Sequence, residues 1–408
     1  MGLNSETKSN RVHIGIFGRT NSGKSSIINS ITNQELSIVS DIEGTTTDPV
    51  YKAMELLPIG PVIFIDTAGI DDISVLGKKR AKKTNDVLNK VDVAIVVIDG
   101  KAGLSIDDIN LINCMDGLDI PYLVAINKID IVDDSNKIID EINANEINNY
   151  VLVSASTGEN MDKLKEDLAE LTPTDLNRSN IISDKLEQLD LVVLVIPIDK
   201  GAPKGRLIYP QHQTIRDILD VGAIPIITRD TELVDMLKSL VKKPKLVITD
   251  SQVFKFVDSV VQKDIMITSF SVLFSRYRGD LEENIRAALA VESLKDGDCV
   301  LISEGCTHHR QCEDIGTVKI PRMLDKYLNA DNKEDVKTIK YEFTSGNEFP
   351  TDLSKYKLVI HCGACLLNYR EMQHRIKVCK NGSIPITNYG ILMAYLNGIL
   401  DRCTEVFN

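Results

Sequence analysis

The sequence of 408 residues lacks a long hydrophobic run, since no stretch approaches the roughly 18 uninterrupted apolar residues that a membrane helix needs. It also lacks an excess of positive charge: 47 Lys and Arg residues stand against 59 Asp and Glu residues, a net charge of −12. Proteins that hold a nucleic-acid backbone usually concentrate positive charge. We therefore expect no membrane and no nucleic acid among the partners. Residues 1–11 contain neither the apolar core of a signal peptide nor an Arg-rich presequence, so we expect a cytoplasmic location.

Cysteine is nearly absent from the first 298 residues, where only Cys114 occurs, whereas the other seven of the eight cysteines lie in the last 110 residues. In a cytosol that keeps thiols reduced, such clustering favours metal binding or thiol chemistry over disulfides. The apolar fraction of 43% and the charged fraction of 26% are those of a globular chain. At about 150 residues per domain, the length predicts two to three domains.

Alternating apolar runs and helical stretches predict three α/β domains. Residues 1–172 contain five short runs rich in β-branched residues, which are typical of buried parallel strands. Polar residues around Pro173 are a plausible linker. Residues 180–262 form a smaller βαβαβ pattern, and residues 265–408 form a third α/β block that contains the cysteines. The middle pattern carries no motif of a site, so we expect it to form a homodimer.

A phosphate-binding loop is predicted at residues 18–25, which match G-x-x-x-x-G-K-[ST] between an apolar run and a helical pattern. The glycines Gly18 and Gly23 allow backbone N–H groups to wrap the phosphates. Lys24 neutralises phosphate charge, and the Ser25 hydroxyl can bind Mg²⁺.

Three further motifs follow in order, each at the end of an apolar run. Asp66-Thr-Ala-Gly69 places a carboxylate near Mg²⁺ and an N–H near the γ-phosphate, while Asp130 of Asn127-Lys128-Ile-Asp130 can accept both hydrogen bonds of a guanine ring. An adenine ring offers no such donor pair, so the nucleotide is expected to be GTP or GDP. The predicted nucleotide-binding residues are Gly18, Asn21, Ser22, Gly23, Lys24, Ser25, Ser26, Asp66, Asn127, Lys128, Asp130, Ser154 and Ala155.

These motifs resemble those of the translation-factor-like GTPases of the Era and TrmE group, which have a Ras-like P-loop fold. Their switch element G-T-T-x-D is present as residues 44–48, and the resemblance implies that Thr46 binds Mg²⁺ and the γ-phosphate. Ile70 stands where Ras-like proteins place a water-orienting glutamine. In the TrmE-like group an asparagine at the position of Asn21 helps to hold K⁺, so K⁺ is an expected cofactor. The expected catalytic residues are Lys24, Thr46 and Gly69.

The cysteine-rich end contains Cys306-Thr-His308 and, about fifty residues later, His361-Cys362-Gly-Ala-Cys365. By spacing alone, the three cysteines with His308 could form a tetrahedral zinc site. Three thiolates would equally suit an iron–sulfur cluster with one accessible iron. A group of unligated thiols is the third possibility, and the spacing does not separate these alternatives.

A C-x-H motif followed by H-C-x-x-C behind such a GTPase domain resembles the HydF family, the maturation GTPases and scaffolds of [FeFe]-hydrogenases. The resemblance implies a [4Fe–4S] cluster on Cys306, Cys362 and Cys365. His308, His361 and Glu313 are candidates for a fourth, exchangeable ligand. It further implies that a di-iron H-cluster precursor is assembled with two radical-SAM maturases, carried by this protein and delivered to the apo-hydrogenase.

Some cysteines fall outside this pattern. Cys312 departs from it and is either an alternative ligand or a packing residue, whereas Cys299, Cys379 and Cys403 have the sequence context of structural cysteines.

The alternative function is an RNA- or ribosome-associated GTPase with a structural zinc domain. The acidic charge and the lack of a G-x-x-G RNA-clamping module disfavour it.

Overall fold

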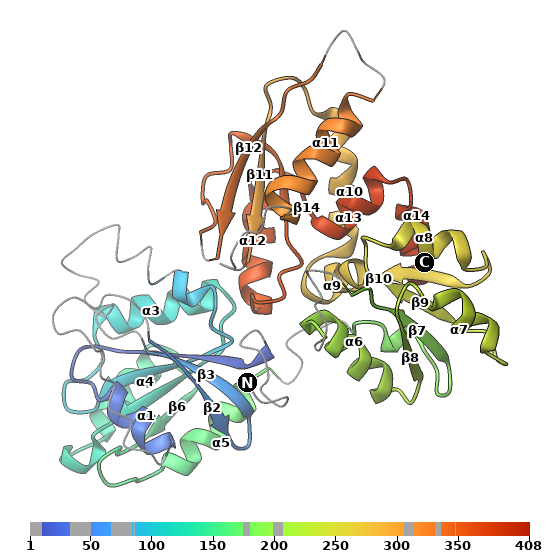
Figure 1. The fold of residues 1–408 in the computed structure, drawn as a ribbon. Coiled ribbons are helices and arrows are strands. Elements are labelled where there is room, and N and C mark those ends of the chain that lie inside the picture. Colours follow the sequence, from blue (N-terminus) through green and yellow to red (C-terminus); the bar gives the residue numbers. More distant parts are fainter. Residues whose placement is uncertain are drawn as a thin grey trace. The chain divides into compact units, whose positions relative to one another are not determined.

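The computed structural model describes residues 10–32, 50–66, 84, 86–173, 180–198, 207–305, 314–330, 336–346 and 348–408. The chain separates into two compact units, Met1–Leu176 and Asn177–Asn408. Unit 1 contains one sheet and unit 2 contains two (Figure 1). This arrangement confirms the predicted α/β class with three sheets, while the predicted boundaries at 172, 180–262 and 265 stay a proposal.

Unit 1 is built on a six-stranded sheet of order β2-β3-β1-β4-β5-β6. All neighbours are parallel except β2 and β3. The five predicted runs are strands, and β2 is an antiparallel edge strand that the apolar pattern does not predict. The strands are β1 Val12–Phe17, β2 Val50–Leu56, β3 Gly60–Asp66, β4 Val93–Asp99, β5 Tyr122–Asn127 and β6 Tyr150–Leu152.

Helices cover both faces of this sheet. On one face, α1 and α5 contribute Ile27, Ile28 and Leu164 to the core, and on the other α3 and α4 contribute Leu111 and Ile142. In such doubly wound sheets, ligands bind at the carboxyl ends of the strands. The helices are α1 Lys24–Thr32, α3 Ile106–Gly117, α4 Asn136–Ala144 and α5 Met161–Leu171, with a short 3₁₀ turn η2 Ile129–Ile131.

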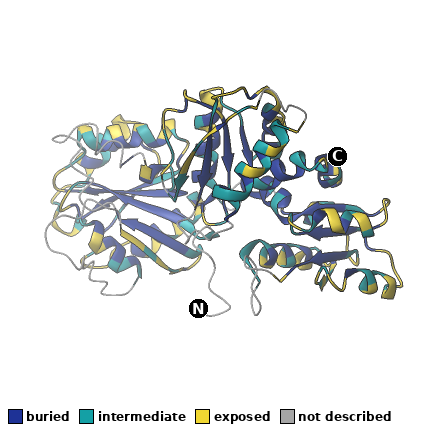
Figure 2. Cartoon of the chain, turned by 45° about the horizontal axis from the view of Figure 1, so that its top comes forward, coloured by how far each residue is buried: buried dark blue, intermediate teal, exposed yellow. Residues whose placement is uncertain are grey.

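The first sheet of unit 2 has four parallel strands in the order β10-β9-β7-β8. Its strands are β7 Leu191–Val195, β8 Ile224–Thr228, β9 Leu246–Thr249 and β10 Met266–Ser269, and its helices are α6 Tyr209–Asp220, α7 Leu233–Ser239, α8 Phe254–Val260 and α9 Phe270–Arg278, with η3 Ser183–Lys185. Strand β10 is buried, whereas the opposite edge strand β8 is partly exposed (Figure 2).

The second sheet of unit 2, of order β12-β11-β13-β14, is also parallel. Its strands are β11 Cys299–Glu304, β12 Lys340–Ser345, β13 Tyr356–His361 and β14 Ile386–Asn388. The remaining helices are α10 Leu281–Ala288, η4 Leu289–Ser293, the π-helix η5 Ile315–Lys319, α11 Ile320–Leu328, α12 Tyr369–Asn381, α13 Tyr389–Leu396, α14 Leu400–Thr404 and η6 Glu405–Phe407. None of the described helices is long and apolar enough to cross a bilayer.

One hydrophobic cluster joins the first sheet of unit 2 to helices near the end of the chain. Val247 and Ile267 of the first sheet pack in the same cluster as Ile391 of α13 and Cys403 of α14. The Thr268 hydroxyl donates to the carbonyl of Cys403 at 2.8 Å. The last helices of the chain therefore return to the first sheet after the second sheet is complete.

Candidate functional site

The phosphate loop, residues 18–25, leaves the carboxyl end of β1 with a backbone that requires glycine. Gly18 has φ +140° and Gly23 has φ +97°. A Cβ on Gly18 would lie 2.2 Å from the carbonyl oxygen of Val97, and one on Gly23 would lie 2.1 Å from Nδ2 of Asn127. The backbone of the loop is therefore packed directly against β4 and the end of β5, and no larger residue fits.

Three amine and amide groups hold the loop in place. Lys24 Nζ donates to the carbonyls of Gly18 at 2.5 Å and Arg19 at 3.0 Å. Lys128 Nζ donates to the carbonyl of Asn21 at 2.6 Å and pairs with Asp99 at 2.7 Å. Asn127 Nδ2 donates to the carbonyl of Ser22 at 3.0 Å. Asn127 and Lys128 of the predicted base-binding motif thus support the phosphate loop.

The end of β5 and the loop after β6 form the predicted base-binding side. Asp130 accepts hydrogen bonds from Ser154 Oγ at 2.7 Å and Ser156 Oγ at 3.1 Å. The bond from Ser154 is the main cause of the lowered pKa of Asp130. The Ala155 N–H donates to Asn127 Oδ1 at 3.1 Å. The Asp130 carboxylate is therefore held ionised, as an acceptor of two guanine N–H groups must be.

The residues expected at Mg²⁺ are described in part. Asp66 ends β3 in register with Ile16 of β1, so its buried carboxylate lies at the same sheet edge as the phosphate loop. Ser25 and Ser26 are exposed on the first turn of α1, and Asn21 is exposed with φ +66°. The catalytic candidates Thr46 and Gly69 lie outside the described residues.

At the cysteine-rich end, the parallel register brings together the carboxyl ends of β11 and β13, the strands that precede the two motifs. Ser303 of β11 pairs with His361 of β13, and the Cys362 N–H donates to the carbonyl of Ser303 at 2.9 Å. The Gly305 N–H donates to Cys362 Sγ at 3.1 Å. Gly305, the last described residue before Cys306, therefore lies beside Cys362.

The surroundings of Cys362 suit a metal-bound sulfur. Burial, together with the charge of Glu304, raises the pKa of the Cys362 thiol, and hydrogen bonds from the amides of Gly305 and Ala364 and the charge of Arg375 offset only part of that rise. Amide groups directed at a sulfur stabilise a thiolate, the form that binds iron or zinc. Cys365 is also partly exposed. The two amide donors at the Cys362 sulfur are the described feature that fits a metal-bound thiolate.

His361 is fully buried between two partners. Its Nε2 lies 3.0 Å from Nη1 of Arg375, and its Nδ1 lies 2.8 Å from the carbonyl oxygen of Cys362. Arginine can only donate, so Nε2 accepts and the proton is on Nδ1, which donates to the carbonyl. Burial and the charge of Arg375 lower the pKa of His361 to about 3, and the ring is neutral.

The remaining candidates of this end are outside the described part of the chain. They are Cys306, His308, Cys312 and Glu313. Among the residues that the structure does describe, no three His, Cys, Asp or Glu side chains converge on a point where they could hold a metal ion. Cys299 begins β11 at the opposite edge of the sheet, and Cys379 and Cys403 are buried in helices.

Two residues near Cys362 were not predicted. Tyr389 donates to the buried carboxylate of Glu304 at 3.2 Å, and burial, followed by the charge of Cys362, raises the pKa of this tyrosine. A Cβ on Gly316 would lie 2.2 Å from the Tyr389 hydroxyl and 2.7 Å from Glu304 Oε1. The only sequence signal was the stretch 313–322 next to Cys306, which contains this glycine.

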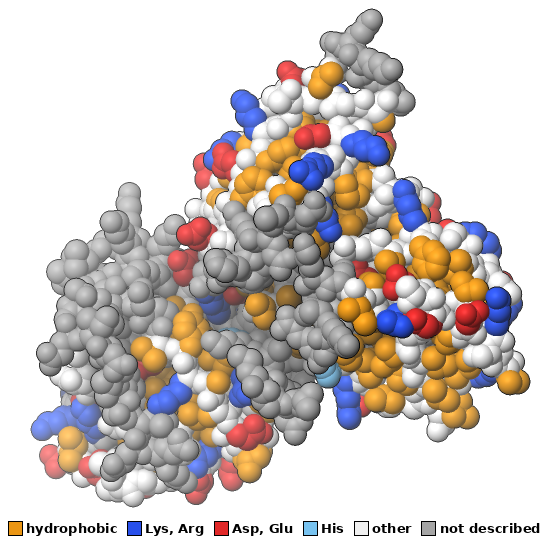
Figure 3. Space-filling view, viewed as in Figure 1, with side chains coloured by type: hydrophobic (Ala, Val, Ile, Leu, Met, Phe, Trp, Pro, Cys, Tyr) orange, Lys and Arg blue, Asp and Glu red, His pale blue; other side chains and the backbone are white. Residues whose placement is uncertain are grey.

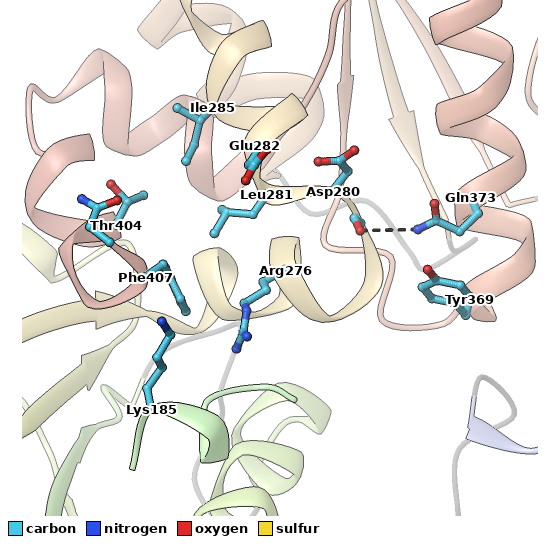
Figure 4. A pocket seen from close by; sticks show the side chains of 12 residues that line it. Lys185, Arg276, Asp280, Leu281, Glu282, Ile285, Tyr369, Gln373, Thr404 and Phe407 are labelled. Carbon is cyan, nitrogen blue, oxygen red and sulfur yellow. Dashed lines mark hydrogen bonds between the residues drawn. The ribbon is translucent and has the colours of Figure 1, made fainter. Parts of the chain in front are cut away.

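Unit 2 also has a cavity of about 530 Å³ around α9 and α10 (Figure 4). Arg276 in its wall forms a two-point ion pair with Asp184 at 2.6 and 2.7 Å. Gln373 donates to the carbonyl of Gly279 at 3.4 Å. None of the predicted site residues lines this cavity.

Three models of known protein families match successive segments of the chain. The model "50S ribosome-binding GTPase" matches residues 13–128, which contain the phosphate loop, Asp66 and Asn127. Together with the geometry above, this match defines unit 1 as a P-loop GTPase domain, a class for which GTP, GDP and Mg²⁺ are typical ligands. The models "Hydrogen maturase F dimerization domain" and "Hydrogen maturase F tetramerization domain" match residues 181–279 and 282–406, more than half of the chain. The chain belongs to the hydrogen maturase F (HydF) family, as its motifs predict.

Individual relatives are GTPases. GTPase Der of Wolinella succinogenes is 34% identical over 169 residues, 40% of this chain and 36% of that protein. The tRNA modification GTPase MnmE of Desulforamulus reducens is 36% identical over 155 residues, 37% of this chain and 32% of that protein. GTPase Era of Halothermothrix orenii is 29% identical over 187 residues, 45% of this chain and 63% of that protein. The chain thus spans less than two thirds of each of these relatives.

Proposed function

We propose that this protein is a GTP-hydrolysing scaffold that binds a [4Fe–4S] cluster through Cys306, Cys362 and Cys365 and delivers the di-iron precursor of the H-cluster to apo-[FeFe]-hydrogenase. The proposal is supported by the family matches over residues 181–406 and by the hydrogen bond from Gly305 to Cys362 Sγ. The radical-SAM maturases that the family implies are the partners that supply the precursor. A ribosome-associated role is less well supported, because the name of the matching GTPase model concerns residues 13–128 alone.

At the nucleotide end, the loop amides would wrap the phosphates of GTP and Lys24 would neutralise the charge that develops on the β- and γ-phosphates. Ser25, Thr46 and Asp66 would hold Mg²⁺, and the Gly69 N–H would bind the γ-phosphate. Asn21 would place K⁺ against the same phosphates. Lys24 now bonds to two loop carbonyls, so nucleotide binding exchanges these bonds for bonds to phosphate.

At the cysteine end, the resident cluster would supply an iron that three protein thiolates leave open to an exchangeable ligand. The N–H groups of Gly305 and Ala364 stabilise the Cys362 thiolate that such a cluster needs. An exchangeable position suits a carrier, since the cargo must leave. His308, His361 and Glu313 were the sequence candidates for that position, and all three remain to be compared by substitution.

Metal quantitation on anaerobically prepared protein tests the cysteine site. We expect about four irons and little zinc per chain, with an electron paramagnetic resonance signal after reduction. Cys362→Ser should remove most of the iron. The matched control is Cys299→Ser, because Cys299 begins β11 and lies about 16 Å along the strand from its carboxyl end at Glu304. Stoichiometric zinc in place of iron, or equal iron in both variants, would overturn the proposal.

Self-association is indicated by the names of the two family models, and we propose that β8 makes the dimer contact. This edge strand pairs only with β7 among the described strands, and it exposes Ile224 and Ile227 by 41% and 50%. Hydrophobic side chains also gather on the face of the molecule over β8 and α7 (Figure 3). An exposed apolar edge strand is a template for pairing with a second copy. The other edge, β10, is already covered.

Sedimentation velocity tests this contact. A lysine at Ile224 or Ile227 places a charge in the paired edge, so either substitution should convert the dimer to a monomer at micromolar concentration. Ile106→Lys on α3 of unit 1 is the control, since Ile106 is 77% exposed in the other unit. A dimer that survives both β8 substitutions would exclude this strand as the interface.

A further inference from the structure

The cysteine end contains a buried cation that the predicted ligand set does not include. Arg375 of α12 is 1% exposed, and its guanidinium reaches the carboxyl ends of three strands. It donates to Ser303 Oγ of β11 at 3.3 Å, to His361 Nε2 of β13 at 3.0 Å and to the carbonyl of Gly346, which follows β12, at 2.6 Å. Glu371, one helical turn earlier, accepts a further bond at 3.2 Å. One side chain therefore joins the ends of three neighbouring strands, two of which, β11 and β13, lead to the cysteine motifs.

The guanidinium of Arg375 determines which ring nitrogen of His361 carries the proton. Because Arg375 occupies Nε2, the other nitrogen carries the proton and donates to the carbonyl of Cys362. Neither nitrogen has a lone pair directed at the cysteine sulfurs. The ring instead links Arg375 to the main chain of Cys362, whose sulfur meets the amide of Gly305.

We propose that Arg375 is a positioning residue of the cysteine site, and that it acts through His361 to fix the main chain of Cys362. His361 then belongs to the support and is not a ligand. The inference rests on the proposed cluster-binding function. Its physical basis is that a metal centre requires sulfur positions fixed to a fraction of an ångström, and outer groups that hold the ligands commonly change metal affinity by about 10- to 100-fold.

The test compares two arginines of unit 2. Arg375→Gln removes the cation and most of its bonds, and Arg402→Gln is the control, because Arg402 likewise donates to a carbonyl, that of Ile265 at 2.6 Å, and to Asp258. Both proteins are reconstituted with iron, and the rate of iron loss to a chelator and the spectrum of the reduced cluster are measured. We expect Arg375→Gln to lose iron about 10-fold faster with a changed spectrum. Arg402→Gln should match the unsubstituted protein in both measurements.

A second variant tests whether His361 supports the site or is itself a ligand of the cluster. His361→Asn keeps a donor at the position of Nδ1 and removes the acceptor for Arg375. If His361 supports the site, the cluster assembles but loses iron faster, as in Arg375→Gln, and its coupling to nitrogen nuclei is the same with and without the imidazole. Loss of a nitrogen coupling in His361→Asn would identify a ligand and overturn the inference. If Arg375→Gln does not fold, Arg375→Lys keeps the charge without the planar fork and should show the faster iron loss.

The outcomes distinguish the two proposals. If the unsubstituted protein binds no iron, the cluster-binding function fails and the inference fails with it. If the unsubstituted protein, Arg375→Gln and Arg402→Gln hold iron equally well, only the inference about Arg375 is wrong.

Discussion

The nucleotide end and the cysteine end both lie at the carboxyl ends of parallel strands, yet they are built in different ways. A phosphate is held mainly by backbone amides, and one contiguous loop after β1 supplies them. The cysteine site takes side chains from the loops after β11 and β13, and Arg375 of α12 joins those strand ends. A site made of backbone leaves a continuous motif in the sequence, whereas a site made of side chains distributes its support over distant segments.

The largest effects are expected from two variants, one at each end of the molecule, which test whether GTP turnover and iron binding are independent. Lys24→Ala should lower GTP turnover by at least about 100-fold, because it removes the mobile cation on the β- and γ-phosphates, and should leave the iron content unchanged. Cys306→Ser should remove most of the iron and leave GTP turnover unchanged. Turnover and iron are measured on both proteins, with the exposed Lys163→Ala as control. If either variant loses both properties, the two ends are not independent.

The base-binding side should show the next largest effect. Asp130→Asn replaces the acceptor that Ser154 and Ser156 hold ionised, so the two guanine N–H groups lose their partner. We expect GTP affinity to fall by about 10- to 100-fold. Titration calorimetry measures the change, and the exposed Asp133→Asn should bind like the unsubstituted protein. Unchanged affinity in Asp130→Asn would remove this residue from the site.

A smaller effect is expected from the monovalent cation. Because Ile70 stands in place of a glutamine, hydrolysis should be several-fold faster in K⁺ than in Na⁺ buffer at equal ionic strength. Asn21→Ala should abolish that difference while GTP still binds. Equal rates in the two buffers would exclude Asn21 as a cation ligand.

The smallest expected effect is on the stability of unit 2, through the ion pairs of Asp258. Lys263 and then Arg402 hold the pKa of Asp258 below its usual range against the cost of desolvation. A lowered carboxyl pKa contributes stability above the unfolded value near 4 and loses it as the pH falls through the folded value. Asp258→Asn should therefore lower the free energy of unfolding at pH 7 by less than about 1 kcal/mol. Denaturation at pH 7 and pH 3 checks that the difference shrinks in acid.

Most strands were predictable because they are buried on both faces and form continuous apolar runs, as β4 does with six buried residues. The missed strands β2 and β12 are edge strands whose residues are largely exposed or half-buried, so their sequences VYKAMEL and KYEFTS show no such run. Strands β10 and β14, which were also missed, are buried but have only four and three residues. Length and exposure, more than composition, limited the prediction.

The nucleotide motifs are recognisable in the sequence because each adjoins its own strand, whereas the residues that support the cysteine site were not predicted. Nothing around Arg375 marks it, since it lies within an ordinary helical pattern fourteen residues after His361. Likewise, Glu304 and Tyr389 are separated by 85 residues and meet only when β11 and α13 pack together. Contacts of this kind depend on the tertiary fold, which a single sequence does not reveal.

The return of α14 to the first sheet of unit 2 has a mechanical consequence. The segment between α9 and α14, which includes the cysteine site, is attached to that sheet at both of its ends, through α9 and through Cys403 and Arg402. A segment tethered at one end can swing freely, but one tethered at two ends can rotate only about the line that joins the tethers. Two tethers would therefore restrict any rotation of this segment against the first sheet to a single axis.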